Sequence, residues 1–459
     1  MNGGAGHHKH IQGINLHAVL RGEGISEPAV GSKTGLFNQA YKVLSHVEGP
    51  ADESLYGYYV PGRIEVLGKH TDYAGGHSLV AAAERGFCLL ARPRSDRIVR
   101  ITDVGFSETI EFELGPDLEP EIGSWSNYPM TVARRVARNF AEPLRGGEVA
   151  FGSDLPVAAG MSSSSALMVG IFLILCRINQ LEERAVYRDV IQGPEALAEY
   201  LGTVENGQSY GPLAGDKGVG TFGGSEDHMA MLCSEAGRMK LYGYGPVGFK
   251  RSVKMPAGYA FAIAGSGVAA EKTGGAREKY NRASRLAGRA VDVWRKKRGG
   301  RESHLGAIAR EASNVEPLRR MLRNHRGDEF KGEELLERFE HFYAENEEII
   351  PKAVAALEED ELSEFGRQVD RSQELAETLL KNQVAETVFL ARRARELGAA
   401  AASAFGAGFG GSVWALVREE KVEAFIRGWA ESYRKAYSEV SQHAQFFASG
   451  AGPAAWAVF

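Results

Sequence analysis

Hydrophobic and polar positions follow two different patterns along this chain. In the first third, apolar residues occur in short runs bounded by glycine, proline or charge, as in YYVPGRIEV at 58–66 and FCLLARPRSDRIVRIT at 87–102. Such runs predict short paired strands, and the first is expected to turn at Pro61-Gly62. Between about residues 276 and 397, apolar positions recur every three or four residues under charged faces, which predicts amphipathic helices with solvated charge. Together these patterns indicate an α+β fold.

Strand and helix signals alternate in the rest of the chain. The segment 125–140 has apolar residues at helical spacing. The apolar run at 166–178 suits a buried helix, because a membrane span needs about 18 or more such residues. The remaining predictions are strands at 148–156, after 247, within 401–417 and at 454–459, and a helix at 421–438.

The length of 459 residues suits two or three domains. The pattern changes near residue 245, where a second half with strands and helices begins. We therefore expect an N-terminal domain at 46–245 and a C-terminal domain at 246–459. Residues 1–45 show no clear period and are expected to form a partly disordered, mobile extension or an added edge.

Charge and composition disfavour several function classes. Lys and Arg number 54 against 59 Asp and Glu, and the net charge of −5 suits neither a nucleic-acid partner nor a polybasic membrane contact. The N-terminus lacks an apolar signal segment, so a cytoplasmic protein is expected. Three separated cysteines offer neither a disulfide framework nor a zinc site. The 56 glycines cluster at 57–86, 202–224, 243–275 and 406–411, which indicates loops with a function.

The segment from Leu155 to Ala166 carries the most informative local signal for a ligand. A strand runs into small residues and four consecutive serines, which open the apolar helix. Main-chain N–H groups at a helix start, the helix dipole and small side chains together favour a phosphate. The alternative is a serine-rich helix cap without a ligand. No GxxxxGK[ST] string occurs, which disfavours a conventional phosphate loop.

Three further segments concentrate polar groups or glycine. PGRIEVLGKHTDYAGG at 61–76 holds four polar side chains within ten positions, Arg63, Lys69, His70 and Asp72. This density suits recognition of a polyhydroxylated substrate, although Arg63 and Asp72 could instead pair with each other. GGSEDHMAML at 223–232 places Glu226, Asp227 and His228 at a helix start, where a carboxylate can cap the helix or act as a base. GAGFGGS at 406–412 permits a tight turn near a ligand or close packing.

Taken in order, these segments resemble the three motifs of the sugar kinases in the GHMP superfamily, galactokinases above all. The matching strings are PGRIEVLGKHTDYAGG, LPVAAGMSSSSA and GAGFGG, and WSNY at 125–128 and GGSEDHMA at 223–230 are similar to two further family segments. The resemblance extends from about residue 55 to the end of the chain. It implies a two-domain GHMP kinase fold, with an N-terminal ribosomal-protein-like α/β domain, a C-terminal ferredoxin-like α+β domain and the active site in the cleft between them.

The resemblance also implies the reaction, which is transfer of the γ-phosphate of MgATP to the anomeric (C1) hydroxyl of galactose or a related monosaccharide. Asp227 corresponds to the general base, and Arg63 to the arginine that keeps it ionised and offsets phosphoryl charge. The implied ATP contacts are Trp125, Gly160, Ser162, Ser163 and Ser164, and the implied Mg²⁺ ligands are Ser164 and Glu205. The implied sugar contacts are Arg63, Lys69, His70, Asp72, Gly224, Asp227 and Tyr280. These roles agree with phosphoryl transfer, which relies on positioning and charge stabilisation.

Three departures from the family pattern concern the site. Lys69 replaces a glutamate that contacts the sugar C6 hydroxyl, so an anionic sugar such as galacturonate or a sugar phosphate is an alternative substrate, unless Lys69 pairs with a protein carboxylate. Tyr280 matches the family's tyrosine only with a short insertion, and an ungapped alignment places Arg277 there. Glu205 lies 22 positions before Asp227 because of an apparent insertion, SYGPLAGDKG.

Two other functions stay open from the sequence. A GHMP kinase for mevalonate or a heptose phosphate is disfavoured by the intact HTDY string at 70–73 and by WSNY. A catalytically silent sensor of sugar and ATP is disfavoured because Arg63, Asp227 and Ser164 are all present. The expected partners are a small-molecule sugar and MgATP, without nucleic acid or membrane, and the expected assembly is a monomer or weak homodimer.

Overall fold

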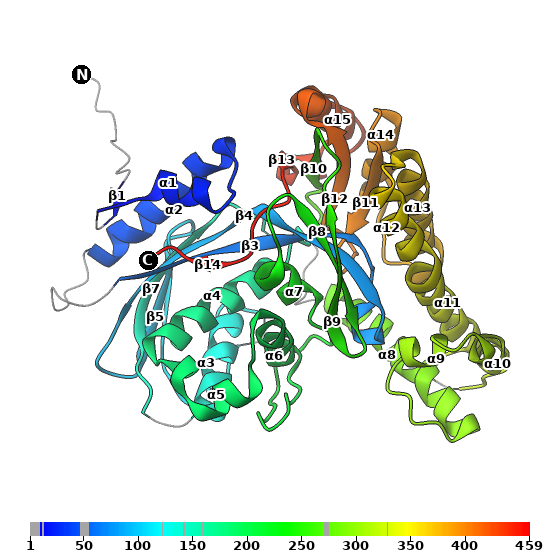
Figure 1. Cartoon of the computed structure of the whole chain (residues 1–459), viewed down its shortest axis with the longest axis horizontal. Helices are drawn as coiled ribbons and strands as arrows, with labels where there is room; N and C mark the ends of the chain where they lie inside the picture. The colour runs from blue at the N-terminus through cyan, green and yellow to red at the C-terminus, as the bar shows by residue number, and fades with distance from the viewer. Residues whose placement is uncertain are drawn as a thin grey trace.

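The computed structural model of this chain describes residues 10–11, 13–45, 55–121, 123–140, 143–157, 159–269, 275–327 and 329–459. Among these residues, the larger sheet has eight strands in the order β14-β3-β4-β7-β5-β6, with β8 beside β4 and β9 beside β8 (Figure 1). Its strands are β3 (Tyr56–Leu67), β4 (His77–Pro93), β5 (Ile98–Asp103), β6 (Glu108–Glu113), β7 (Gly147–Ser153), β8 (Arg238–Tyr244), β9 (Val247–Lys254) and β14 (Trp456–Ala457).

Different helices cover the two faces of this sheet. On one face, α2 (Glu27–Ser45) contacts β4 and β7, and α1 (Leu16–Gly22) packs on α2 after a short hairpin of β1 (His10–Ile11) and β2 (Ile14–Asn15) (Figure 1). The other face carries α3 (Asn127–Asn139), α4 (Ser163–Ile178), α5 (Ala185–Val190), α6 (Pro194–Asn206) and α7 (Glu226–Cys233). The sheet is therefore buried on both sides, which is why its central strands are apolar at nearly every position.

Helix α4 is apolar around nearly its whole circumference because it is buried on all sides. It packs on β3 and β4 and also contacts α3, α6 and α7. The apolar run at 166–178 is thus the core helix that the sequence predicted. Within the described ranges, no helix has both the length and the apolar character needed to cross a membrane.

The second sheet has four strands in the order β11-β12-β10-β13. These are β10 (Tyr259–Gly265), β11 (Ala401–Phe405), β12 (Ser412–Arg418) and β13 (Gln445–Ser449). One face joins the core of the larger sheet through Phe261, Trp414 and Phe447. The opposite face packs under α14 (Ala385–Glu396) and α15 (Val422–Ala436), and α12 (Ile350–Glu358) and α13 (Leu362–Leu375) lie on the first face beside β11.

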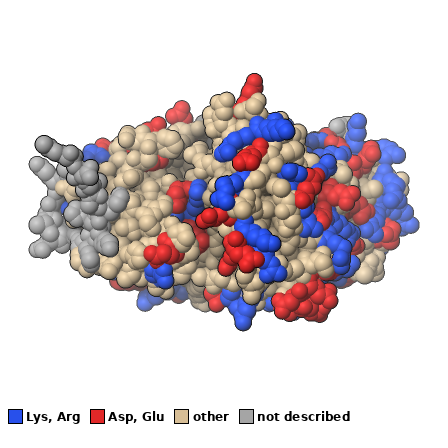
Figure 2. All heavy atoms as spheres, turned by 90° about the horizontal axis from the view of Figure 1, so that it is seen from above, with Lys and Arg blue, Asp and Glu red and all other residues tan. Residues whose placement is uncertain are grey.

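Four helices form an addition to this second half, with a small core of their own. They are α8 (Gly275–Arg298), α9 (Leu305–Ala309), α10 (Ala312–Arg323) and α11 (Gly332–Tyr343). Trp294, Leu318 and Phe339 fill that core, and Ala74 of the short turn η1 (Asp72–Ala74) joins it. Figure 2 shows Lys and Arg interleaved with Asp and Glu over this end of the molecule, as expected for a solvated charged surface.

The prediction of a turn at Pro61-Gly62 is wrong, because strand β3 continues through both residues. Pairing with β4 only shifts register between Pro61 and Arg63. At this bulge the Arg63 N–H donates to the Met161 carbonyl at 3.3 Å, and Gly62 lies so close to Leu155 that a Cβ there would clash with it. The irregularity therefore joins the strand to the serine loop instead of reversing the chain.

The described part of the N-terminal segment is helical, although its sequence shows no clear period. Helix α2 buries Lys33, Thr34 and Asn38 among its apolar contacts, and these polar residues obscure the periodicity. Lys33 is paired with Asp154 of the sheet. Within the extension at 1–45 that was expected to be partly disordered, residues 1–9 and 12 lie outside the described ranges. The domain limits at 45/46 and 245/246 stay predictions, and β9 extends the first sheet to Lys254.

Candidate active site

Arg63 and Asp227 meet in the interior although they are 164 positions apart in the sequence. Arg63 stands on β3, and Asp227 lies in the first turn of α7. The Arg63 Nε donates to Asp227 Oδ1 at 2.6 Å, and its Nη1 donates to the Gly160 carbonyl at 2.8 Å. Burial acts to lower the pKa of Arg63, but three neighbouring carboxylates outweigh burial and raise it. The guanidinium therefore stays charged and holds both the aspartate and the serine loop.

A small cavity of about 40 Å³ opens beside this pair. Its wall includes five carboxyl side chains, those of Glu65, Asp72, Glu205, Glu226 and Asp227, together with His70, Asn206 and Tyr280. Among the described residues of this wall, Arg63 is the single Lys or Arg. The Gly224 N–H donates to Asp72 Oδ2 at 3.0 Å, and a Cβ at position 224 would lie 2.5 Å from that oxygen. The cavity is thus polar, closely packed and acidic.

His70 uses both ring nitrogens within the protein. Its Nδ1 lies 2.7 Å from the Tyr73 hydroxyl, and its Nε2 lies 3.0 Å from the Ala407 carbonyl. Because a carbonyl only accepts, Nε2 carries the proton and Nδ1 accepts from Tyr73. Burial lowers the pKa of His70 to about 3, and the charge of Arg338 acts in the same direction. His70 therefore presents a neutral ring to the cavity, with its centroid 5.1 Å from that of Tyr280.

Gly160, the carbonyl partner of Arg63, belongs to the wall of a second, larger pocket of about 470 Å³. Apolar side chains form much of this wall, and the predicted nucleotide contacts Trp125, Gly160, Ser162, Ser163 and Ser164 all line it. The Trp125 Nε1 donates to Glu108 Oε2 at 2.8 Å, which fixes the indole. Phe106 and Val157 are 67% and 73% exposed in the same wall. An apolar surface next to main-chain N–H groups suits a flat base with a phosphate tail.

The glycine-rich segment at 406–411 packs against the serine loop. The Ser412 Oγ donates to the Ala159 carbonyl at 2.6 Å. Gly160 has a φ of 72° and Ser162 a φ of 57°, so the loop makes two left-handed bends before α4 begins. A Cβ on Gly160 would lie 3.2 Å from the Phe405 carbonyl. The three predicted motif segments therefore meet at one place, which the sequence implied only through the family resemblance.

Ser165 is the serine that contacts the carboxylates in this structure. Its Oγ lies 2.8 Å from Glu205 Oε2 and 3.4 Å from Asp227 Oδ2. The described part of the chain holds no cluster of three or more His, Cys, Asp or Glu that could bind a metal alone. Mg²⁺ does not need one, because it binds one or two protein oxygens and keeps water and phosphates as its other ligands. Ser164 lines the larger pocket and Glu205 the small cavity, and each offers an oxygen of the kind that Mg²⁺ binds.

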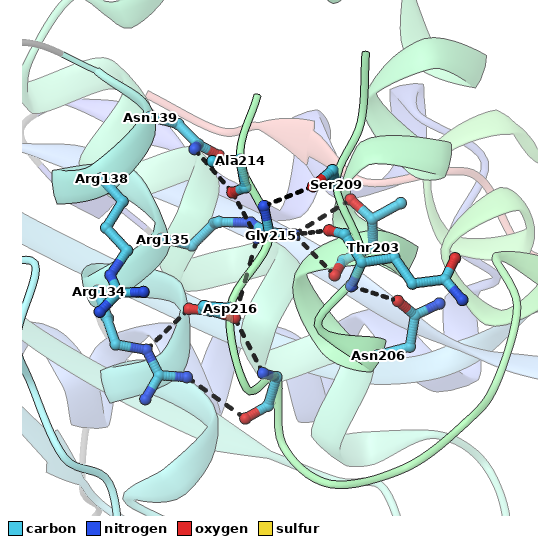
Figure 3. A network of polar contacts seen from close by, with 12 residues as sticks. Arg134, Arg135, Arg138, Asn139, Thr203, Asn206, Ser209, Ala214, Gly215 and Asp216 are labelled. Atoms are coloured by element: carbon cyan, nitrogen blue, oxygen red, sulfur yellow. Dashed lines mark hydrogen bonds and ion pairs between the residues drawn. The ribbon is translucent and has the colours of Figure 1, made fainter. Parts of the chain in front are cut away.

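The insertion between Glu205 and Asp227 is fixed to α3 by a buried network (Figure 3). The Arg134 Nε donates to Asp216 Oδ2 at 2.8 Å, and these side chains are 5% and 1% exposed. Arg135 donates to the main-chain carbonyls of Thr203, Gln208 and Ala214. At the end of the insertion, the Asn206 Nδ2 donates to the Gly223 carbonyl at 2.8 Å. The network therefore holds the segment that forms the cavity wall at Gly223 and Gly224.

The Lys69 side chain does not line the small cavity, where the predicted sugar contacts gather. The side chain is fully buried, and its Nζ lies 2.8 Å from Ser403 Oγ and 3.2 Å from Ser372 Oγ. It is not part of the cavity wall. Ser372 in turn donates to Glu345 Oε1 at 3.0 Å, so this polar cluster gives a buried ammonium the partners that it needs. Lys69 thus joins the β3 side of the molecule to α13 and β11.

Of the two residues considered for the sugar's aromatic contact, the structure brings Tyr280 to the cavity. Its hydroxyl lies so close to Gly223 that a Cβ there would be 2.8 Å away. Arg277 instead lies against the insertion, where its Nη1 would be 3.3 Å from a Cβ on Gly220.

Sequence reasoning missed Glu65, Asn206 and Ser165, and considered Glu226 only as a helix cap or base. A signal for Glu65 existed, because a residue two positions after Arg63 on a strand faces the same side. Asn206 follows Glu205 at the end of α6, and its place in the wall depends on the course of the insertion. Ser165 could not be singled out from the four serines, because the serine that faces the carboxylates depends on the residue at which α4 begins.

Comparisons with known proteins agree with this geometry. The galactokinase galactose-binding signature matches residues 48–93, the GHMP kinase N-terminal domain matches 127–208, and the GHMP kinase C-terminal domain matches 353–435. The galactokinase of Roseiflexus sp. (strain RS-1) is 28% identical over 408 residues, covering 87% of this chain and 90% of that protein.

Solved structures show the same fold. Lactococcus lactis galactokinase complexed with galactose superposes with a TM-score of 0.74 at 22% identity, covering 91% of this chain and 98% of that one. Methanococcus jannaschii mevalonate kinase gives a TM-score of 0.52 at 13% identity, covering 88% and 99%. The predicted two-domain α+β fold is confirmed.

Proposed function

Because this chain is a galactokinase-like sugar kinase of the GHMP kinase superfamily, we propose that it transfers the γ-phosphoryl group of MgATP to the anomeric hydroxyl of a neutral monosaccharide, with galactose as the first candidate. One observation carries the proposal, the contact of Arg63 Nε with Asp227 Oδ1 at 2.6 Å. The same guanidinium donates to the Gly160 carbonyl of the serine loop. An acceptor hydroxyl in the small cavity and a phosphate on the loop would therefore meet beside one arginine.

In this proposal Asp227 accepts the proton of the sugar hydroxyl. The hydroxyl oxygen forms a bond to the γ-phosphorus, and the bond from that phosphorus to the bridging oxygen of ADP breaks. A carboxylate paired with a buried guanidinium stays ionised, and a weak acceptor suffices for the loose transition state of phosphoryl transfer. Arg63 also offsets the charge on the transferring group. The chain's main task is to position the two reactants.

The serine loop and the larger pocket would hold the nucleotide. Main-chain N–H groups at the start of α4 face the triphosphate in this arrangement, and the Trp125 ring lies by the base. Ser164 and Glu205 would hold Mg²⁺, which neutralises phosphate charge when it is bound. The hydrogen bond from Trp125 to Glu108 keeps the indole in place before the nucleotide arrives.

The charge of the small cavity supports a neutral sugar over an anionic one. Five carboxyl groups of the described residues face it, and the one guanidinium among those residues is already paired with Asp227. A uronic acid or a sugar phosphate would need a free cation there. Lys69, the cation considered for that role, contacts Ser372 and Ser403 away from the cavity.

The test is coupled ADP release with galactose, galacturonate, glucuronate, arabinose, fucose and a hexose 6-phosphate. We expect turnover with galactose or a close neutral relative and none with the anionic sugars. Asp227→Asn should lower kcat by roughly 100- to 10,000-fold while nucleotide affinity stays within a few-fold, because a proton acceptor is lost. Asp117→Asn, which changes a carboxylate that is 96% exposed, is the matched control.

Near-normal turnover of Asp227→Asn would contradict the role given to that aspartate. A chain that binds both sugar and ATP but releases no ADP with any sugar would be a sensor, and the kinase proposal would fail. Turnover confined to an acidic or phosphorylated sugar would contradict the choice of a neutral substrate.

A further inference from the structure

Two glutamates lie next to the Arg63–Asp227 pair without a part in the mechanism above. Glu65 on β3 and Glu226 at the start of α7 are 3% and 4% exposed. The Arg63 Nη2 lies 3.8 Å from Glu65 Oε2, and the Arg63 Nε lies 3.6 Å from Glu226 Oε1. One oxygen of each, Glu65 Oε1 and Glu226 Oε1, is buried without a hydrogen-bond partner. The guanidinium thus faces three carboxyl groups at once.

The two glutamate side chains also lie close enough to each other for a hydrogen bond between them. Such a bond needs a proton, because an ionised carboxylate can only accept. Burial raises the pKa of Glu226 well above its usual range, and the charge of Glu65 acts in the same direction. Burial raises the pKa of Glu65 as well, although Arg63 and Lys69 oppose it. Two like charges that are buried beside the same guanidinium favour one shared proton.

We propose that Glu65 and Glu226 hold one proton between them and act as positioning residues that keep the Arg63 guanidinium on Asp227. This inference rests on the proposed function and deepens it. With the proton in place the pair carries one negative charge, and Arg63 Nε stays at 2.6 Å from Asp227 and at 3.6 Å from Glu226. When the proton leaves to solvent, the second carboxylate competes with Asp227 for the same N–H.

Other charged or titratable groups face the pair from each neighbouring element. They are Arg63 on β3, Lys69 in the segment after β3, Asp72 and Tyr73 in η1, Asp227 on α7 and Tyr244 on β8. Burial raises the pKa of Tyr244 well above its usual range and that of Asp72 above its usual value. Neither Tyr244 nor Asp72 is hydrogen-bonded to Arg63. Loss of the proton from the glutamate pair is therefore the titration that should weaken the contact between Arg63 and Asp227.

The first experiment is the pH dependence of kcat for the sugar, measured by coupled ADP release. In the unsubstituted enzyme, kcat should fall about tenfold per pH unit on the alkaline side, because one proton is lost from the pair. Glu226→Gln should lack this fall, since the amide donates to Glu65 at every pH and the pair keeps a single negative charge. Glu65→Gln should also lack the alkaline fall, because its amide donates to Glu226 at every pH. This second variant tests the proposal if Glu226→Gln does not fold.

Tyr244→Phe is the matched control. Its hydroxyl contacts Ser78 Oγ at 2.7 Å, so the substitution disturbs the same buried region without changing its charge. A merely structural change should shift kcat evenly at all pH values and keep the alkaline fall. Only removal of the shared proton should change the shape of the profile.

A second readout does not depend on activity. A carboxyl group with a raised folded pKa keeps its proton where the unfolded chain has released it, at pH above about 4.3. The folded state therefore binds more protons than the unfolded state, and stability falls as pH rises from there to the raised pKa. Glu226→Gln lacks this loss. The Tm of Glu226→Gln minus that of the unsubstituted chain should thus increase with pH across the window.

The outcomes separate the two proposals. The shared-proton proposal would be wrong, whatever sugar is used, if kcat still falls at alkaline pH in both glutamine variants and the Tm difference does not change with pH. A Tm difference that grows with pH in a chain that phosphorylates no sugar would support the shared proton and reject the kinase proposal. Both readouts as predicted would support both.

Discussion

The small cavity lined by Arg63 and the larger pocket lined by Gly160 differ in size and in chemistry. The cavity beside Arg63 and Asp227 is about 40 Å³ and is enclosed by carboxyl groups and glycine backbone, whereas the pocket beside Trp125 is about 470 Å³ and largely apolar. Fixed polar groups can reject a sugar whose hydroxyls do not match them, because unmatched buried groups lose their partners. An apolar surface discriminates far less. We therefore expect substrate choice to depend on the small cavity and the larger pocket to contribute nucleotide affinity.

This contrast also has a structural side. The buried ion pair of Arg63 on β3 and Asp227 on α7 lies in the wall of the small cavity, while exposed side chains such as Phe106 and Val157 border the larger pocket. Rigid surroundings hold polar groups in register with a substrate. Changes to the two pockets should therefore separate cleanly into effects on the sugar and effects on the nucleotide.

The largest effect is expected where the cavity wall is anchored. Asp216→Ala leaves the Arg134 guanidinium buried without its carboxylate, and removal of one partner of a buried pair costs about 3–5 kcal/mol. The free energy of unfolding should fall by that amount in urea titrations. In the surviving folded enzyme, KM for the sugar should rise more than KM for ATP, because the insertion leads directly to Gly223 and Gly224 in the wall of the small cavity.

Glu111→Ala is the control for this substitution. It removes the partner of Arg100 at a pair that is 42% and 46% exposed, so the loss should stay below about 1 kcal/mol. Equal losses for the two variants would show that the Arg134–Asp216 pair is not a structural anchor.

A smaller but still large effect is expected at Arg63, which lines the small cavity and donates to Gly160 in the wall of the larger pocket. Arg63→Lys retains the charge but cannot donate to Asp227 and to Gly160 in the same geometry. The value of kcat should fall by roughly 100-fold, equivalent to about 2.7 kcal/mol. Coupled ADP release measures it, with the exposed Arg100→Lys as the matched control. A loss of less than about threefold would mean that charge alone suffices there.

The smallest of the three effects belongs to the larger pocket. Trp125→Ala removes an aromatic face worth about 1 kcal/mol, so KM for ATP should rise roughly tenfold or less while KM for the sugar stays the same. Trp125→Phe keeps a ring and should restore most of the affinity. A rise in KM for the sugar of the same size would contradict the separation of the two pockets.

Much of the fold could be predicted because the relevant information is local. The apolar run at 166–178 is too short to span a membrane and too apolar for a surface, which left a core helix, and α4 is that helix. The helix at 125–140 and the helical stretch after 276 followed from their spacing in the same way. In the N-terminal segment the same reasoning failed, because Lys33, Thr34 and Asn38 occupy buried positions of α2.

In the candidate site, too, local features could be predicted from the sequence and long-range contacts could not. By itself the sequence determined which segments carry polar groups and glycine, because motifs such as GKHTDY and the four serines are continuous in the chain. Only the tertiary structure decided that Arg63 pairs with Asp227, that Lys69 points to Ser372 and Ser403, and that Glu65 lies beside Glu226. The physical reason is that each of these choices depends on which partners a buried charge finds, and those partners come from segments far away in the chain.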